Sequence, residues 1–532
     1  MKRICLFCML CVISFSTFAQ LKIDNAILLI QSGATVTVQG DVASNVDILG
    51  TGLMQLKGSV NQNIDMGGFT IPNLEIDNGA NATLLSDARI GSSMTFTNGK
   101  IILGDFNVRL SDVATSSGAG AGKFYETTGT GQLQKEITSD LTGYSLPLGI
   151  GTNYYPASIT TTGTYISAKV GVQAKNGADP NKHPRSTDYL NLYWPINQSG
   201  ISGIVNVNGN YNTNFSGTET ELRGIFWNNG TNEWTLTGCN INTTTDEASA
   251  NIAGNGDLYA MNRFVLSKMK VFLQGAFNGT NMNDNLRKPS NLIPLSDPYR
   301  TAPYNTNFAH VNNSDSEVAN ASVFNNALNS DDDIVDWVFL ELRDNSEPNP
   351  GKHIVQTRSA LVQRDGDIVD IDGVSPVYFK NIDAGSAYVL AVRHRNHLGI
   401  ATDPVANLQS LDLAVTGTTD FTTMADTQIF GPATAFTTIG GKSLLWGGNS
   451  SYALFTGTQR VAFINPGNDK DYILVNALSN NPAGSITNTY HVADLNMNRT
   501  VRFINPQNDK DFLLINVLNN NPGTTRLQSL PK

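Results

Sequence analysis

The sequence predicts a mostly β fold, and three observations support this prediction. Short segments in which apolar and polar residues alternate recur along the chain, as in residues 34–38 (ATVTV), and a period of two is typical of strands. Gly and Asn punctuate the gaps between these segments, as turns require. Charged residues make up 15% of the 532 residues, against the roughly 25% of ordinary soluble domains. We expect a solenoid-like or meander N-terminal region, β-sandwich modules and a small α-containing C-terminal repeat pair.

Residues 1–19 have the order of a secretory signal peptide. The first three residues (MKR) include two basic side chains, an apolar stretch follows, and a small-residue site ends at Ala19. This order predicts export with cleavage after Ala19, and therefore a secreted protein, extracellular or on the cell surface. The exported chain keeps one cysteine, Cys239, so no internal disulfide is expected.

The region from residue 20 to 188 opens with short strands separated by polar turns. This spacing is typical of stacked rungs in a β-solenoid, where each rung buries its face on the next, or of a long meander. The solenoid interpretation predicts parallel pairing of neighbouring rungs between Leu21 and Leu110. The run NQNIDMGGFTIPNLEIDNGANATL at residues 61–84 resembles the solenoid-like opening of secreted multidomain surface proteins from the Bacteroidetes.

Residues 189–266 form the next predicted module, a β-sandwich. Trp227 and Trp234 flank the turn NNGTN, which predicts a hairpin. The early YW pair and this tryptophan hairpin resemble a small sandwich of Bacteroidetes surface proteins. Tryptophan side chains on strands either pack in the core or stack on a sugar ring, and we favour core packing.

Residues 267–438 form a second predicted β-sandwich, in which alternation implies one buried face per strand. The words FLQGAFNG, IVDWVFLELRD, RSALVQRDGDIVDIDG and VRHRNHLGI resemble, in this order, a module that precedes C-terminal dockerin-like repeats in Bacteroidetes proteins. Acidic groups at residues 331–333 and 365–372 are interpreted as solvated strand ends, because an acidic run specifies no catalytic pocket. His394 and His397 are interpreted as a strand-end loop that faces water or an acidic partner surface.

The C-terminal region, residues 439–532, contains an internal duplication. Residues 461–478 recur as residues 501–518, and both copies continue to Asn-Asn-Pro. In each copy Asp469 or Asp509 is expected to cap a short helix with apolar side chains four residues apart. We therefore expect two similar loop-helix units.

A calcium loop is predicted before the second of these helices. Asp494, Asn496 and Asn498 supply oxygen side chains at loop positions 1, 3 and 5, and the carbonyl of Thr500 supplies position 7. This alternation turns the oxygens toward one hard cation such as Ca²⁺. The duplicated loop-helix pair resembles a divergent type I dockerin, whose members carry two calcium loops.

Two positions depart from the dockerin pattern. Arg499 stands where the loop glycine is expected, and Asn505 stands where the last acidic ligand is expected. Asp511 is the expected replacement carboxylate. The matching positions of the first copy are Leu454, Thr456 and Thr458. We therefore expect weak calcium binding in the second copy alone; the alternative is a capped helical pair that binds no metal.

Charge and motifs exclude several functions. The formal net charge of −10, with no basic cluster to offset it, argues against a nucleic-acid partner. No run of 18 apolar residues follows the signal segment, so no transmembrane helix is expected in the exported chain. Gly-x-Ser-x-Gly, His-Glu-x-x-His and dinucleotide-binding motifs are absent from the sequence, which argues against those enzyme classes.

The sequence thus favours a non-catalytic binding, adhesion or assembly protein, with an extracellular protein or a glycan as partner. The alternative is a carbohydrate-binding or enzymatic component of extracellular polysaccharide breakdown, because solenoids and dockerin-like ends also occur there.

Overall fold

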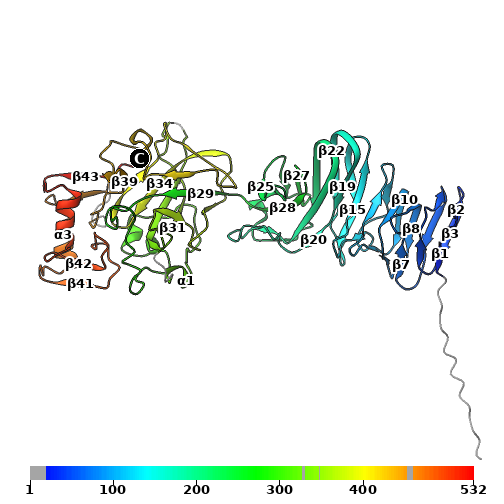
Figure 1. Cartoon of the computed structure of the whole chain (residues 1–532), viewed down its shortest axis with the longest axis horizontal. Coiled ribbons are helices and arrows are strands. Elements are labelled where there is room, and N and C mark those ends of the chain that lie inside the picture. The colour runs from blue at the N-terminus through cyan, green and yellow to red at the C-terminus, as the bar shows by residue number, and fades with distance from the viewer. Residues whose placement is uncertain (1–19, 326–329, 347, 452–458, 532) are drawn as a thin grey trace, which may run out of the picture. The chain divides into compact units, whose positions relative to one another are not determined.

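The computed structural model describes residues 20–325, 330–346, 348–451 and 459–531. The chain divides into two compact units, Met1–Asn262 (unit 1) and Arg263–Lys532 (unit 2), drawn from blue to green and from green to red in Figure 1. The predicted signal peptide lies outside the described residues. Within the part of the chain that is described, none of the helices has the length and apolar character needed to cross a bilayer.

Unit 1 begins with a β-solenoid that occupies residues 21–149. Leu21 pairs in parallel with Val42, and Val42 pairs in parallel with Ile64, so a rung takes 21 or 22 residues there. The parallel solenoid predicted from the sequence is therefore confirmed. The parallel strands of one of its sheets are β1 (Leu21–Ile23), β4 (Val42–Ser44), β7 (Gln62–Asp65), β9 (Ala82–Leu84), β11 (Ile101–Ile102), β14 (Tyr125–Glu126) and β17 (Leu148–Ile150), and β18 (Asn153–Tyr154) follows as an antiparallel edge strand.

A second parallel sheet of the solenoid shows why the rungs stack. Met54 pairs with Leu74, and Leu74 pairs with Met94, and all three side chains are buried. Each rung thus covers the apolar side chain of the rung before it, which removes that surface from water. The strands of this sheet are β3 (Thr35–Val38), β6 (Leu53–Leu56), β8 (Thr70–Asp77), β10 (Ala88–Asn98), β12 (Val108–Leu110), β13 (Thr115–Ser117) and β15 (Leu133–Ile137), and β2 (Leu29–Ile30) pairs with β5 (Leu49–Gly50) nearby.

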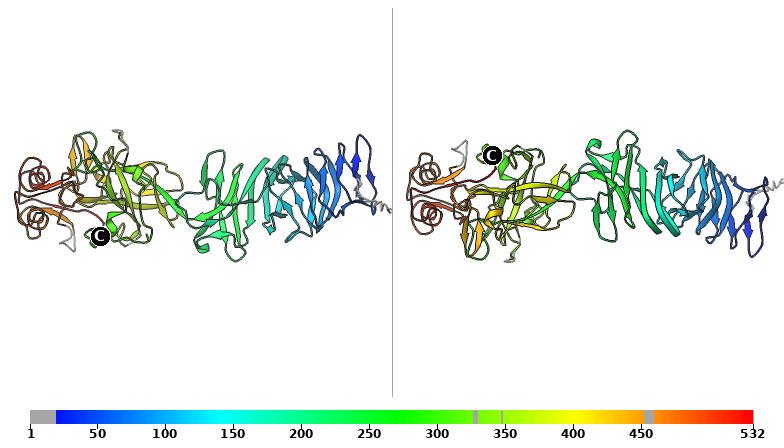
Figure 2. Two further views of the ribbon diagram at one scale, coloured as in Figure 1. Left: turned by 90° about the horizontal axis from the view of Figure 1, so that it is seen from below. Right: turned by 90° about the horizontal axis from the view of Figure 1, so that it is seen from above.

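Parallel pairing gives way to antiparallel pairing at β15. This strand pairs in parallel with β12 and antiparallel with β19 (Ala157–Val172). The register of β19 shifts between Tyr165 and Lys169, which marks a β-bulge. The antiparallel part continues through β16 (Leu141–Leu146), β22 (Leu192–Asn210), β24 (Leu222–Asn228), β25 (Glu233–Thr235), β26 (Asn240–Asn242), β27 (Glu247–Asn251) and β28 (Gly256–Asn262), which Figure 2 shows in cyan and green.

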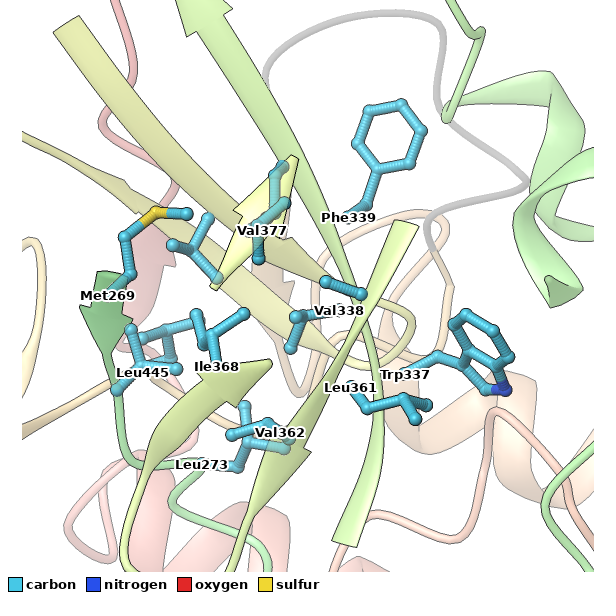
Figure 3. Packing of buried hydrophobic residues seen from close by; sticks show 14 of the residues in the cluster. Met269, Leu273, Trp337, Val338, Phe339, Leu361, Val362, Ile368, Val377 and Leu445 are labelled. Atoms are coloured by element: carbon cyan, nitrogen blue, oxygen red, sulfur yellow. The ribbon is translucent and has the colours of Figure 1, made fainter. Parts of the chain in front are cut away.

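Unit 2 is built on an antiparallel sheet with the strand order β33-β29-β32-β31-β30-β34-β35. One face of it carries the core that Figure 3 shows, in which Met269, Val338, Val362 and Leu445 are buried together. The predicted module boundary at residues 266 and 267 falls within β29. The bounds are β29 (Phe264–Lys270), β30 (Ile334–Arg343), β31 (Ile354–Gln363), β32 (Asp367–Val369), β33 (Val377–Lys380), β34 (Ser386–His394) and β35 (His397–Ala401), with β36 (Gln409–Leu411) and β37 (Thr418–Asp420) at its margins.

The central strand β30 is buried along its whole length, so the expectation of one buried face is wrong for this strand. Trp337 and Phe339 lie on the face away from Val338 (Figure 3). The indole of Trp337 donates to the carbonyl of Pro294 at 2.8 Å, and the ring of Tyr299 lies 5.5 Å from that of Phe339. The segment that precedes helix α1 (Ala321–Phe324) therefore covers the second face.

The C-terminal duplication folds as two similar loop-helix units. Helix α2 (Asp469–Asp471) continues as a turn of π-helix, η6 (Tyr472–Ala477), and its counterparts are α3 (Asp509–Asp511) and η7 (Phe512–Val517). The short strands of this region are β38 (Thr437–Ile439), β39 (Lys442–Leu444), β40 (Arg460–Ala462), β41 (Ser485–Thr487), β42 (Thr500–Arg502) and β43 (Thr525–Leu527).

The residues that cap these helices differ from the prediction. The side chain of Asn468 accepts from the Asp471 N–H, and Asn508 accepts from the Asp511 N–H, so these asparagines are the N-caps. The expected caps, Asp469 and Asp509, are instead buried beneath the preceding loops.

Candidate functional site

The predicted calcium loop of the second copy is folded around its first acidic residue. Asp494 is buried, and its two carboxylate oxygens accept from the backbone N–H groups of Asn498 and Arg499, both at 2.9 Å. The side-chain oxygen of Asn496 accepts from the Asn498 N–H at 3.2 Å, and that of Asn498 accepts from the Thr500 N–H at 3.0 Å. Four of the five predicted site residues are thus brought together in one turn.

Arg499 has the left-handed backbone conformation that favours the glycine expected at this position. Its φ of 73° lies in the left-handed region, where a side chain is strained. The guanidinium offsets this strain by donating to the carbonyls of Asn285 and Ser290, at 3.0 and 2.9 Å. The departure at this position therefore fastens the loop to the sheet unit. The matching ligand positions of the first copy, Leu454, Thr456 and Thr458, lie outside the described residues.

A second buried carboxylate, that of Asp509, lies beneath the same loop. Its oxygens accept from the N–H groups of Leu495 at 2.7 Å and Arg502 at 2.8 Å. Burial raises the pKa of Asp494 to about 6 and that of Asp509 well above its usual range, and the negative charge of Asp494 raises the pKa of Asp509 further. Two buried like charges favour a shared proton or a cation between them. The sequence analysis assigned Asp509 to helix capping and therefore missed its position beneath this loop.

The fifth predicted residue, Asp511, is placed differently. Its carboxylate is partly exposed, accepting from the Lys510 ammonium at 2.5 Å and from the Asn508 amide at 2.7 Å, and Lys510 lowers its pKa. Asp511 therefore already has a cationic partner.

An open pocket of about 430 Å³ brings Asp511 together with Asn496 and Asn498. Seven of its ten lining side chains are amides, which donate and accept hydrogen bonds without carrying charge. The apolar part of the lining comes from Phe512 and Ile515. This mixture suits a polar, uncharged surface with an apolar contact.

Exposed apolar side chains occupy matching positions in the two copies. Ile464 is 59% exposed and its counterpart Ile504 is 42% exposed, while Val475 is 46% and its counterpart Ile515 is 49% exposed. The helices bury a different set, which includes Ile473 and Leu513.

The histidines of the β34–β35 hairpin are buried, so the prediction that they face water is wrong. Asp336 of β30 accepts from His394 Nε2 at 3.1 Å and from Arg395 Nε at 2.9 Å. Its second oxygen accepts from the Tyr490 hydroxyl at 2.7 Å. Although burial disfavours the carboxylate, Arg395 and His394 hold the pKa of Asp336 at about 2. This network fastens the repeat pair to the sheet.

The hydrogen bonds also fix the protonation of both histidines. His394 must carry its proton on Nε2, which faces Asp336, so its Nδ1 accepts. His397 Nδ1 lies 2.9 Å from His394 Nδ1 and 2.8 Å from the oxygen of Asn396, while its Nε2 accepts from the Gly275 N–H at 3.0 Å. Both rings are therefore neutral, and burial lowers the pKa of each. The two histidines therefore have a structural role: His394 links β34 to Asp336 of β30, and His397 links β35 to the backbone at Gly275.

Asp297, His310 and Glu317 lie close enough together to share a metal ion. His310 Nε2 lies 2.8 Å from a carboxylate oxygen of Asp297. The carboxylate of Glu317 forms ion pairs with the guanidinium groups of Arg300 at 2.8 Å and Arg358 at 3.4 Å. Because two guanidinium groups already supply positive charge, we interpret this cluster as a network of ion pairs.

The tryptophan hairpin of unit 1 packs against itself. The rings of Trp227 and Trp234 lie 5.2 Å apart edge to face, and Trp234 stacks on Tyr259 at 6.1 Å. The Trp234 indole N–H donates to the carbonyl of Asn181 at 3.2 Å. The two indoles are half-buried and serve mainly to join strands.

No protein-family model, curated protein or solved structure matches the chain.

Proposed function

We propose that this protein is a secreted, non-catalytic binding and assembly protein whose C-terminal repeat pair docks to an extracellular protein. The observation that carries the proposal is the repetition of exposed apolar side chains, Ile464 and Val475 in one copy and Ile504 and Ile515 in the other. Single exposed apolar residues are ordinary, but matching positions in both copies present the same feature twice. Full burial of such a side chain contributes roughly 1.5–3 kcal/mol.

The amide-lined pocket supports the same proposal. Ile515 and Phe512 lie in its lining beside the amides of Asn496 and Asn498. An apolar centre with polar groups around it is the usual anatomy of a protein interface. A partner side chain that enters here finds apolar contact and hydrogen-bonding groups together.

Calcium belongs to this proposal as a structural ion. Asp494 and Asp509 supply two carboxylates whose pKa values are raised by burial, and Asn496, Asn498 and Thr500 supply neutral oxygens. A bound Ca²⁺ would neutralise the pair and rigidify the docking unit. Few charged ligands imply weak binding, roughly 10⁻⁴ to 10⁻³ M, as in other extracellular modules.

A second candidate function is carbohydrate binding in polysaccharide breakdown, favoured by a pocket in unit 1 that Arg109 and Lys169 line. The acidic group at residues 365–372 is a weaker candidate, as a site of glycan hydrolysis. Asp370 is buried and accepts from the N–H groups of Ile371 at 2.7 Å and Tyr378 at 3.2 Å, which is a structural role. Turnover of any glycan that Asp370→Asn abolishes would contradict the non-catalytic proposal.

The test is affinity capture from the extracellular fraction of the producing organism, with residues 20–532 as bait. The double variant Ile464→Asp/Ile504→Asp should lose a partner that the wild-type chain captures. Val405→Asp is the matched control, because Val405 is 84% exposed in the same unit but lies outside the repeats. Equal capture by the wild type and the double variant would contradict the proposal.

A further inference from the structure

A pocket of about 450 Å³ lies in unit 1, where the solenoid meets the long antiparallel strands. Arg109 of β12, Glu136 of β15 and the bulged segment of β19 around Ser167 line it. Ser167 has a φ of 47°, in the left-handed region. Bulges re-aim side chains and are common beside binding sites, and this one directs Tyr165 and Lys169 to the same pocket.

The cationic side chains of the pocket have unused bonding capacity. Arg89 and Arg109 are directly opposite in the register of β10 and β12, where like charges repel. Glu136 lies between them, but Arg89 engages both of its oxygens, at 3.0 and 2.7 Å. Arg109 Nε is 4.0 Å from Glu136, and this nitrogen has no hydrogen-bond partner among the described residues.

The other charged groups near the pocket are Lys169, Asp112 and Asp140. The structure gives no ion pair to Lys169 within the described ranges, although it lies opposite Glu136 in the register of β15 and β19. The neighbouring acids already accept hydrogen bonds, Asp112 from the Thr138 hydroxyl at 3.2 Å and Asp140 from the Tyr165 hydroxyl at 2.7 Å. The charged side chains that line the pocket are thus two cations, Arg109 and Lys169, and one anion, Glu136, whose two oxygens are engaged by Arg89.

We propose that this pocket binds a uronic acid residue of an acidic polysaccharide. The guanidinium of Arg109 and the ammonium of Lys169 suit one carboxylate, and the ring of Tyr165 offers a face for the sugar. The volume is that of a small-molecule site. An acidic peptide is less favoured, because β19 pairs with β15 and β16 on one side and with β22 on the other, which leaves only the short stretch 162–167 unpaired on the first side, too little for an added strand.

The proposal deepens the proposed binding function by naming a ligand class, and it is independent of docking by the C-terminal repeats. The test is isothermal titration calorimetry on residues 20–532 with the trisaccharides of galacturonic, glucuronic and mannuronic acid and with their carboxyl-reduced counterparts. At least one tri-uronate should bind at one site, and its reduced counterpart should bind at least about tenfold more weakly. Absence of binding by all three, or equal binding of the reduced sugar, would overturn the proposal.

Variants locate the site. Arg109→Gln and Lys169→Gln should each weaken binding about tenfold or more, and Lys22→Gln, an exposed lysine on β1, should leave it unchanged. Thermal melting identifies any variant that misfolds, and the other variant then decides. Tighter binding of hexaglutamate than of any tri-uronate would show a peptide site and overturn the proposal. Ile464→Asp/Ile504→Asp should bind the sugar normally, which separates this test from the docking proposal.

Discussion

Neutralisation of Asp336 is expected to destabilise unit 2 severely. Asp336→Asn removes the negative charge that faces Arg395 at 2.9 Å, and both side chains are buried. A buried charge that loses its partner costs about 3–5 kcal/mol in the free energy of unfolding. The neighbouring Tyr490 hydroxyl and His394 ring lose a charged acceptor as well, so we place the expected loss in the upper part of this range.

The assay is urea denaturation of residues 20–532, monitored by tryptophan fluorescence. Trp337 and Trp446 are the tryptophans that report on unit 2. Asp332→Asn, an exposed acid near the start of β30, is the control and should change the free energy by no more than about 0.5 kcal/mol. Asp336→Leu/Arg395→Met removes both charges and should recover part of the loss. A loss below about 1 kcal/mol for Asp336→Asn would refute the buried-network interpretation.

Three further predictions follow from the same structure. Because burial lowers the pKa of His397, the unfolded chain takes up a proton below its ordinary pKa of roughly 6.5 and the folded chain does not. The stability of the wild type relative to His397→Gln should therefore fall by up to about 1.4 kcal/mol per pH unit below that pH; a pH-independent difference in denaturation midpoints would argue against neutral His397. Calorimetric titration with calcium should show at most one site, and Asp494→Ala and Asp509→Ala should each abolish it; two sites would contradict this. If Kd is about 1 mM, 10 mM Ca²⁺ should raise the free energy of unfolding of the wild type by about 1.4 kcal/mol. In the solenoid, Leu74→Ala should cost about 2–5 kcal/mol in unfolding experiments, because it empties the space between Met54 and Met94, whereas the exposed Val113→Ala should cost less than about 0.5 kcal/mol.

Local patterns in the sequence were sufficient to predict the solenoid and the duplication. The rung of the solenoid repeats every 21 or 22 residues near its start, and each rung needs only its neighbours to bury Met54, Leu74 and Met94. The repeat pair is likewise local, because each helix and the loop beneath it lie within one copy. Such features follow from periodicity and turn residues alone.

The buried network could not be predicted, because it joins residues far apart in the chain. Asp336, His394 and Tyr490 come from β30, β34 and the C-terminal repeat. Alternating arginine and histidine around residue 394 is typical of a solvated surface. Only the tertiary structure shows that each charge has a partner, which lets the segment be buried.

The role of Asp509 was hidden for a related reason. An aspartate at the start of a helix is usually a cap, and the prediction assigned that role to it. In the structure Asn508 caps the helix, which frees Asp509 to hold the loop that begins at Asp494. The same exchange occurs in the first copy, where Asn468 caps and Asp469 accepts from the N–H groups of the preceding chain.

Site-specific photo-crosslinking tests the docking proposal most directly. A photoreactive side chain is placed at residue 464, 475, 504 or 515, or at residue 405 as the control, and each chain is illuminated with the extracellular fraction of the producing organism. The proposal predicts that the repeat positions crosslink to one and the same extracellular protein and that position 405 does not. Crosslinks that are equally frequent at position 405, or absent from all four repeat positions, would contradict it.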